Sequence, residues 1–316
     1  MSAHPMKILV TPRSLTRGGH PALERIKQAG YDIVFSTPGT LPTEAELLEL
    51  LPGCVGYLAG VEPVSATVLD AAADLKVISR NGTGVDKVDL AAAERNGIKV
   101  CRAEGANARG VAELAIACVL SLIRSLPFSD GRMKAETWER RKGVELEDRT
   151  LGLVGCGRIG RLVARMALAF DMKILAHDPC PDESFQPSAS FSYVPIEELL
   201  RRSDIISLHC PALEDGRALV DKDAFARMKD GAYLVNTARG SLIDAAAAMA
   251  ALDSGKLAGL ALDAFDTEPP ADWRLVKHPR VIATPHLGGF TAESVDRAVS
   301  AAVDHLLAAL QTCGGP

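Results

Sequence analysis

The sequence predicts an α/β protein with two doubly wound, largely parallel sheets in separate domains. Short runs rich in Val, Ile and Leu alternate with helical patterns along almost the whole chain, which is typical of successive β–α–β units. The 316 residues exceed the length at which one hydrophobic core usually stops growing, so two domains are expected. A glycine-rich turn in the middle of the chain begins a second series of such units.

The first third of the chain is expected to form one compact unit. Helical patterns over Thr43–Leu51 and Ala66–Ala73 separate some of its strand-like runs, which favours parallel pairing. The five strand-like runs of this unit are Ile8–Val10, Ile33–Phe35, Val55–Leu58, Val77–Ser79 and Lys99–Cys101.

Three further patterns complete the chain. A long apolar helix begins at about Val111, and its stretch Leu114–Ile123 is too short to span a bilayer, which favours a buried helix. Leu151–Val154 has the pattern of a buried strand and leads directly into the glycine-rich turn. Thr291–Thr312 has apolar residues at helical spacing, but its periodicity does not show which domain it packs on.

The bulk composition is that of an ordinary folded protein, with 47% hydrophobic and 24% charged residues. Lys and Arg number 35 against 40 Asp and Glu, so neither a nucleic acid nor a membrane is an expected partner. The seven cysteines are scattered singly, which predicts no metal site and no disulfide framework and fits reduced thiols in the cytoplasm. The first ten residues lack the pattern of an export signal.

A glycine loop follows the strand-like run that ends at Val154. Its sequence is Gly155-Cys156-Gly157-Arg158-Ile159-Gly160, and a helical pattern over Arg161–Phe170 comes next. Between a strand and a helix, the glycines allow a tight turn, close approach to a pyrophosphate and close packing of helix on strand. The free N–H groups at the start of the helix favour a bound phosphate. The loop predicts a dinucleotide site, and an ordinary glycine turn is the alternative.

An acidic residue follows this loop at the expected place. Met172–Ala176 is the next strand-like run, and Asp178 follows Gly160 at about the 20-residue spacing of the dinucleotide motif. A carboxylate there would hydrogen-bond the adenosine ribose hydroxyls and repel a 2′-phosphate. No arginine comes immediately after Asp178, so NAD is favoured over NADP. A chance surface aspartate is the alternative.

Several further blocks carry a resemblance to a known family. Besides the glycine loop, they are Asn81–Asp86, Asn107–Glu113, His209–Pro211, Asn236–Gly240, Ala261–Phe265 with Glu268-Pro269, and Thr284–Gly289. Together they resemble the D-isomer-specific 2-hydroxyacid dehydrogenases, which include phosphoglycerate, glyoxylate/hydroxypyruvate, D-lactate and formate dehydrogenases.

The resemblance implies a domain layout and a reaction. An NAD-binding Rossmann domain of residues 103–286 would be inserted in a flavodoxin-like substrate domain made of residues 1–102 and 287–316. A homodimer would form through the long helix near Val111. The reaction would transfer a hydride between C4 of the nicotinamide and C2 of a D-2-hydroxy acid or 2-oxo acid.

The resemblance also implies three catalytic residues. Arg239 would bind the substrate carboxylate and polarise the keto oxygen, which suits a planar, permanently charged guanidinium. His286 would exchange a proton with the substrate oxygen, because histidine titrates near neutrality. Glu268 would hydrogen-bond that imidazole and favour its charged form. The alternatives are a cap or surface arginine at Arg239 and a solvated turn residue at Glu268.

Other matched positions are expected to bind the cofactor or the substrate. Asp263 would bind the nicotinamide carboxamide, with a capping aspartate as the alternative. The backbone N–H groups of Thr83 and Gly84, with the Asn107 side chain, would bind the substrate carboxylate, although an ordinary turn is a rival there. The expected cofactor-binding residues are Gly155, Gly157, Arg158, Ile159, Gly160, Asp178, His209, Cys210, Pro211, Thr237, Ala238, Asp263, His286 and Gly288.

The substrate group beyond the α-carbon depends on other residues. Arg80 and Arg124 occupy positions that resemble phosphate-contacting arginines of phosphoglycerate dehydrogenases, and Arg13 is a third candidate cation. Against a phosphate, the segment after the third strand offers no cation and carries Glu62 instead. We therefore expect a small polar acid, glycerate/hydroxypyruvate or glyoxylate, with 3-phosphoglycerate as the close alternative.

The sequence alone leaves two other classes of protein as alternatives to a 2-hydroxyacid dehydrogenase. Non-catalytic NAD-sensing corepressors resemble this family, although the set of Arg239, Glu268 and His286 is complete in this chain. Other enzymes with a similar two-domain shape, such as alanine dehydrogenases, lack this order of arginine, glutamate and histidine.

Overall fold

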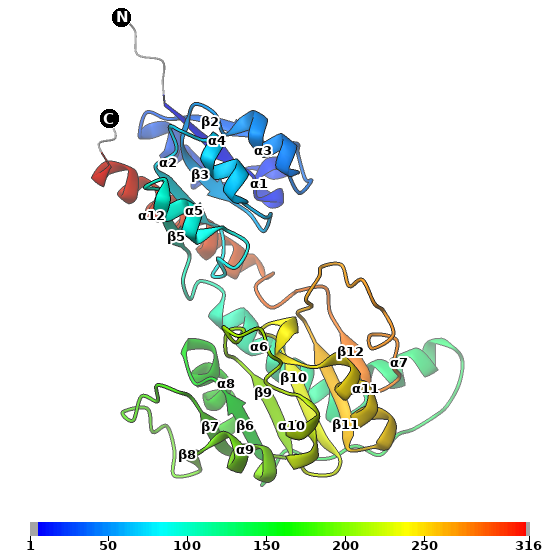
Figure 1. Cartoon of the computed structure of the whole chain (residues 1–316). Helices are drawn as coiled ribbons and strands as arrows, with labels where there is room; N and C mark the ends of the chain where they lie inside the picture. Colours follow the sequence, from blue (N-terminus) through cyan, green and yellow to red (C-terminus); the bar gives the residue numbers. More distant parts are fainter. Residues whose placement is uncertain (1–5, 314–316) are drawn as a thin grey trace, which may run out of the picture. The chain divides into compact units, whose positions relative to one another are not determined.

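The computed structural model describes residues 6–313, which form two compact units (Figure 1). Of the described residues, 6–107 and 292–313 belong to the first unit, and Ala108–Thr291 form the second. Each unit contains one parallel sheet with helices on both faces. The predicted α/β class with two doubly wound parallel sheets is confirmed.

The sheet of the first unit has five strands. They are β1 Lys7–Val10, β2 Asp32–Phe35, β3 Cys54–Ala59, β4 Val77–Arg80 and β5 Lys99–Arg102. All pairs are parallel, and the order β2-β1-β3-β4-β5 is that of flavodoxin-like folds. The order of the strands reverses between β1 and β3, and ligands of such sheets bind beyond the carboxyl ends of the strands at this point.

Helices cover both faces of this sheet. They are α1 Arg13–Gly18, α2 Leu23–Gln28, α3 Glu44–Leu50, α4 Ala66–Ala71, α5 Leu90–Arg95 and α12 Ala292–Thr312. The C-terminal helix α12 packs on β3, β4 and β5, and its buried Val303 and Leu306 share a core with Ile8 and Val10. Helices α3, α4 and α5 enclose the core on the other face. The last helix of the chain therefore packs on the N-terminal third, a choice that its periodicity left open.

The sheet of the second unit has seven strands. They are β6 Thr150–Val154, β7 Lys173–His177, β8 Phe191–Tyr193, β9 Ile205–Leu208, β10 Ala232–Asn236, β11 Leu257–Leu262 and β12 Val281–Ala283. The order β12-β11-β10-β9-β6-β7-β8 runs outward from β6 in both directions, as in Rossmann folds. Its reversal point, between β6 and β9, is where the glycine loop begins.

The helices of the second unit also form two layers. They are α6 Ala108–Ile123, α7 Leu126–Lys134, α8 Arg158–Leu168, α9 Ile196–Arg202, α10 Lys222–Arg227 and α11 Ala245–Ser254, with a 3-10 turn at Gly240–Leu242. Helices α6 and α8 share one core, and α9, α10 and α11 share the other. The predicted helix start at Arg161 was wrong: α8 begins at Arg158, because Gly157 is its N-cap and Gly160 fits inside its first turn.

Polar side chains start five of these helices. Thr43, Ser65, Asp89, Asp221 and Asp244 each accept a hydrogen bond from a backbone N–H two or three residues later. Such N-caps satisfy donors that have no partner within the helix. The sequence therefore marks where α3, α4, α5, α10 and α11 begin.

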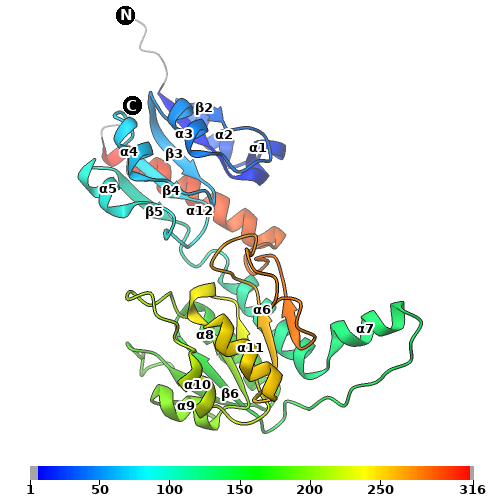
Figure 2. The ribbon, with the colours of Figure 1, turned by 45° about the vertical axis from the view of Figure 1, so that its right-hand side comes forward.

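Helix α7 stands apart from the sheet of its own unit (Figure 2). None of its residues is buried. Within residues 6–313, no single helix is long and apolar enough to cross a membrane. Only α6 and α7 taken together reach that length and character, and a bend of 63° separates them.

Candidate functional site

The predicted cofactor and catalytic residues of the second unit follow the carboxyl ends of its strands. Gly155 comes directly after β6, and Asp178 and His209 come directly after β7 and β9. Asp263 follows β11, and His286 follows β12. In open parallel sheets this edge is where ligands bind. Tertiary structure thus collects residues that are widely separated in the sequence along one edge of a single sheet.

The three glycines of the glycine loop have different surroundings. A Cβ on Gly155, which has φ +93°, would lie 2.5 Å from the carbonyl oxygen of His209, and one on Gly160 would lie 2.2 Å from the Gly155 carbonyl oxygen. A Cβ on Gly157 would meet no described atom within 4 Å. Gly155 and Gly160 are therefore required by the packing of the protein itself, whereas Gly157 leaves open space at the start of α8, where a phosphate fits.

Asp178 ties the glycine loop to the end of β7. Its Oδ2 accepts a hydrogen bond from the Cys156 N–H at 2.8 Å, and its Oδ1 accepts one from the Cys180 N–H at 2.9 Å. Each carboxylate oxygen can accept a further hydrogen bond. The carboxylate is thus held in place and retains the capacity to accept a ribose hydroxyl.

His209 Nδ1 and Thr237 Oγ1 are buried at this edge and have no hydrogen-bond partner among the described residues. Burial lowers the pKa of His209 to about 4, so its ring is neutral at pH 7, and its Nε2 lies 2.9 Å from Ser207 Oγ. Burial also raises the pKa of the neighbouring Cys210 thiol to about 11, while Pro211 is exposed. Buried polar atoms usually have hydrogen-bond partners, so these two unpartnered atoms are consistent with a site in which a bound dinucleotide supplies the missing partners.

The loop after β10 carries Arg239 and is shaped by Asn236. The buried Asn236 side chain donates from Nδ2 to the Arg239 carbonyl oxygen at 2.7 Å and accepts from the Ala238 N–H at 3.0 Å. A Cβ on Gly240 would lie 2.3 Å from the Asp266 nitrogen, so this loop packs against the segment after β11. The role of Asn236 was not predicted, although a polar residue at the end of an apolar strand was the available signal.

His286 and Glu268 form a pair. The two atoms His286 Nδ1 and Glu268 Oε1 are 2.8 Å apart, and Oε1 also accepts from the Phe265 N–H at 3.3 Å. The His286 side chain is 56% exposed and that of Glu268 is 32% exposed, so a small molecule can reach both. The structure therefore brings these two predicted catalytic residues together.

Asp263 holds the segment that carries His286. It is 2% exposed, and its Oδ1 accepts from Thr284 Oγ1 and from the Leu287 N–H, both at 2.6 Å. Its Oδ2 accepts from the Gly288 N–H at 2.8 Å. His286 itself has φ +54°, a left-handed conformation that costs a non-glycine residue about 1 kcal/mol or more and needs support from its surroundings. Binding of the nicotinamide carboxamide by Asp263 stays a prediction.

Apart from Arg239, the predicted carboxylate-binding residues lie in the first unit. Thr83 Oγ1 is 3.1 Å from Asn107 Oδ1, so the structure brings these two side chains together. The carbonyl oxygen of Gly84 accepts a hydrogen bond from Arg80 Nε at 3.1 Å. Arg80 is only 6% exposed, so it supports this loop from within the protein.

The two remaining candidate cations have different positions. Arg13 is exposed at the start of α1, beyond the carboxyl end of β1. Arg124 is exposed just beyond the carboxyl end of α6. This end of α6 packs near the start of β11, because Leu122 lies 3.1 Å from the Cβ position of Gly259. Within the second unit, Arg124 therefore lies away from the edge that carries His286, and its substrate role stays a prediction.

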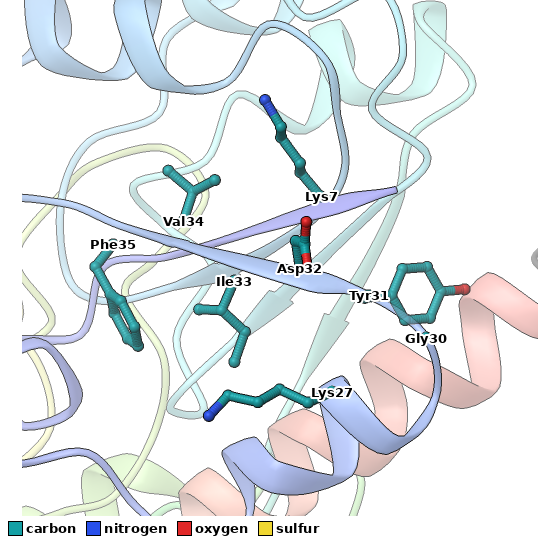
Figure 3. Close-up of a pocket in the computed structure, with 8 residues that line it drawn as sticks. All are labelled: Lys7, Lys27, Gly30, Tyr31, Asp32, Ile33, Val34 and Phe35. Carbon is teal, nitrogen blue, oxygen red and sulfur yellow. The ribbon is translucent and has the colours of Figure 1, made fainter. Parts of the chain in front are cut away.

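A pocket on the first unit is not connected with the predicted site residues. It lies along β2, with Lys7 and Lys27 on opposite sides of the strand and Phe35 at its end (Figure 3). None of its eight lining residues is among those predicted to bind substrate or cofactor. Over the described range 6–313, no group of three or more His, Cys, Asp or Glu side chains is placed to hold a metal ion.

Comparison with known protein families decides the class. The model of the D-isomer specific 2-hydroxyacid dehydrogenase NAD-binding domain matches residues 116–288, which lie within the second unit. The chain belongs to this dehydrogenase family. Members of this family are NAD-dependent oxidoreductases that act on CH–OH donors, and this chain is one of them. The predicted family and the predicted cofactor, NAD, are confirmed.

The dehydrogenase resembles curated proteins with two named activities. It is 41% identical over 258 residues to the hydroxypyruvate reductase of Thermotoga maritima, covering 80% of this chain and 83% of that protein. It is 41% identical over 258 residues to the D-3-phosphoglycerate dehydrogenase of Homo sapiens, covering 81% of this chain but 48% of that protein. The chain thus spans about half the length of the phosphoglycerate dehydrogenase.

A solved structure matches nearly the whole dehydrogenase. A protein from Thermus thermophilus is 35% identical, with a TM-score of 0.88 over 98% of this chain and 99% of that chain. The likeness therefore includes the N-terminal third and the C-terminal helix, which lie outside the residues that the family model matches.

The different surroundings of the glycines predict different effects of adding a methyl group. We expect Gly157→Ala to leave the unfolding temperature without ligand unchanged but to weaken NADH binding about tenfold or more, because only the ligand would meet the new Cβ. We expect Gly155→Ala to lower that unfolding temperature, because φ +93° is strained for alanine and the His209 carbonyl oxygen is in the way. Thermal unfolding and NADH fluorescence titration measure both effects, and equal NADH affinity in Gly157→Ala and wild type would contradict the assignment.

Proposed function

We propose that this dehydrogenase reduces a small, polar 2-oxo acid such as hydroxypyruvate or glyoxylate, and oxidises the corresponding D-2-hydroxy acid in the reverse direction. The observation that carries the proposal is the 2.8 Å contact between His286 and Glu268 at the carboxyl edge of the sheet in an NAD-binding domain. The similarity to a hydroxypyruvate reductase over 80% of the chain supports the choice of substrate.

His286 is proposed as the acid and base of the reaction. When bound, NADH supplies the hydride that reaches C2 of the substrate. Because the Glu268 carboxylate accepts a hydrogen bond from Nδ1–H, Nε2 of His286 is the atom left to give a proton to the oxygen on C2. In the oxidation, Nε2 takes this proton back, and Glu268 stabilises the resulting imidazolium.

Arg239 is proposed to bind the substrate carboxylate and to polarise the C2 carbonyl. A guanidinium can donate to both carboxylate oxygens in one plane and keeps its charge at every working pH. Asn236 holds the loop that carries Arg239, so the guanidinium starts from a fixed backbone. The backbone N–H groups of Thr83 and Gly84 and the Asn107 side chain are proposed to bind the same carboxylate.

The carboxyl edge of the second sheet is proposed as the cofactor site. The pyrophosphate would bind at Gly157 and at the backbone N–H groups that open α8, and Asp178 would accept the ribose hydroxyls, which favours NAD over NADP. The other residues proposed to line the cofactor are Gly155, Arg158, Ile159, Gly160, His209, Cys210, Pro211, Thr237, Ala238, Asp263, His286 and Gly288.

D-3-phosphoglycerate dehydrogenase activity is the second candidate, because the human enzyme is as identical to this chain as the hydroxypyruvate reductase is. A substrate panel separates the two. We expect kcat/KM with NADH to be higher for hydroxypyruvate than for 3-phosphohydroxypyruvate. A hundredfold preference for the phosphorylated compound would refute the first candidate, and no oxidation of NADH with any 2-oxo acid would refute the activity.

The role of His286 predicts a large loss of rate without loss of cofactor. We expect His286→Asn to lower kcat about 10²-fold or more, the usual contribution of a positioned acid or base, with an unchanged Kd for NADH. His278→Asn is the matched control, since His278 also lies near a carboxylate, at 3.5 Å from Asp253, in the same unit. Wild-type turnover in His286→Asn would exclude this residue as the proton donor.

A cytoplasmic homodimer is proposed as the working form. Helix α7 has no buried residue, and Leu126, Met133 and Trp138 are 51%, 56% and 81% exposed. Large apolar side chains gathered on a projecting segment are typical of a surface that a partner covers. All seven cysteines are free, which suits a reducing compartment.

The homodimer predicts an effect of Trp138 on assembly. We expect sedimentation to give twice the chain mass for the wild type and a larger monomer fraction for Trp138→Ser, because the substitution removes buried apolar area from the interface. Trp273→Ser is the control, since Trp273 is also exposed, at 49%, but lies outside α7 and the segment that follows it. A wild type that sediments as a monomer throughout would overturn the proposal.

A further inference from the structure

A buried cluster of polar side chains lies at the carboxyl edge of the first sheet. Thr11 follows β1, Glu62 follows β3, and Arg80 is the last residue of β4. Thr11 is 1% exposed, Glu62 is 0% exposed and Arg80 is 6% exposed. Thr11 and Glu62 stand where the strand order reverses between β1 and β3, the point at which sheets of this order bind ligands.

The Glu62 carboxylate is bound on one oxygen only. Its Oε1 accepts hydrogen bonds from the Tyr57 hydroxyl at 2.5 Å, from the Gly60 N–H at 2.8 Å and from the Thr11 hydroxyl. Its Oε2 is buried and has no hydrogen-bond partner in the described part of the chain. The side chain folds back over Gly60, where a Cβ would lie 2.6 Å from Oε2.

Two more buried polar atoms without partners lie at the end of the adjacent strand β4. Arg80 donates from Nε to the Gly84 carbonyl oxygen, but its Nη1 has no partner among residues 6–313, and the same holds for Asn81 Oδ1. Unpartnered buried atoms are uncommon, and three at neighbouring strand ends indicate that the cluster is incomplete without a further polar group.

The charges of Glu62 and Arg80 oppose one another. Burial lowers the pKa of Arg80, and the Glu62 charge counteracts this shift by favouring the charged guanidinium. In a poorly solvated place two opposite charges act over several ångströms, so each reduces the effect of the other on a third charge. The Glu62 charge therefore weakens the attraction that the Arg80 guanidinium, which supports the Gly84 loop, offers to an anion.

We propose that Glu62 is a positioning residue for substrate specificity: acting through Arg80, it sets the enzyme to 2-oxo acids whose group beyond C2 is uncharged and against those that carry a phosphate. The proposal rests on the proposed function, because it concerns the substrate of that same site. It explains why a buried carboxylate stands at the point of the first sheet where a ligand is expected.

Glu62→Gln tests the charge with little change of shape. The amide can still accept on one oxygen, but Arg80 loses the Glu62 charge and keeps only the smaller effect of Asp86, so a phosphate dianion gains attraction. We expect the ratio of kcat/KM for 3-phosphohydroxypyruvate to that for hydroxypyruvate to rise about tenfold or more, mainly through a lower KM for the phosphorylated compound. Glu49→Gln, which removes one exposed charge from α3 of the same unit, should leave this ratio unchanged.

Gly60→Ala provides a second route if Glu62→Gln does not fold. The added methyl group would lie 2.6 Å from Glu62 Oε2 and 3.2 Å from Pro12 Cα, so it displaces the carboxylate without changing any charged residue, and the backbone at Gly60 does not have a positive φ. The ratio of kcat/KM for 3-phosphohydroxypyruvate to that for hydroxypyruvate should also rise in this variant, because the displaced carboxylate no longer opposes the charge of Arg80.

The outcome can be separated from that of the proposed function. A folded Glu62→Gln or Gly60→Ala variant whose ratio stays within about twofold of wild type would show that Glu62 has only a structural role, and would overturn the inference. The ratio of the two kcat/KM values can change on substitution whichever substrate the wild type prefers. An error in the proposed substrate is therefore detected from the wild-type ratio, and an error in the role of Glu62 is detected from the variants.

Discussion

The segment that carries His286, the residue proposed as acid and base, depends on the hydrogen bonds of the Asp263 carboxylate. This carboxylate is buried, and it accepts hydrogen bonds from the Thr284 hydroxyl and from the N–H groups of Leu287 and Gly288. These contacts fix both sides of His286, whose left-handed backbone needs such support. Removing one partner of a buried charged group costs more than the hydrogen bonds alone, so the loop and the carboxylate stabilise each other.

In each unit, polar groups that the core cannot accommodate lie at the carboxyl edge of that unit's own parallel sheet. In the second unit, the open space beside Gly157 and the unpartnered His209 and Thr237 side-chain atoms lie beyond the carboxyl ends of β6, β9 and β10. In the first unit, Glu62 and Arg80 lie beyond or at the ends of β3 and β4. Parallel strands end together, so each sheet supplies a row of loops on a rigid support.

Sequence reasoning predicted which helices and strands form more accurately than it predicted where they begin or which parts of the protein they pack against. The alternation of strand and helix predicted the α/β class, and the glycine loop was found because strand, glycines and helix followed in order. The start of α8 was missed by three residues because a glycine inside a first helical turn looks like part of the loop. The packing of α12 on the first sheet was implied by the family resemblance but could not be derived from periodicity, since a helix has the same apolar period on either domain.

The sequence by itself determined the fold class and predicted a dinucleotide-binding glycine loop, and its resemblance to a known family pointed to Arg239, Glu268 and His286, the residues proposed for catalysis. These depend on local order, or on motifs whose members lie within a few residues of each other. Only the tertiary structure decided that Asp263 holds the loop of His286 and that the Glu62 carboxylate is buried at the ends of β1 and β3. The physical reason is that the environment of a side chain is set by partners from distant segments, which hydrophobic periodicity does not specify.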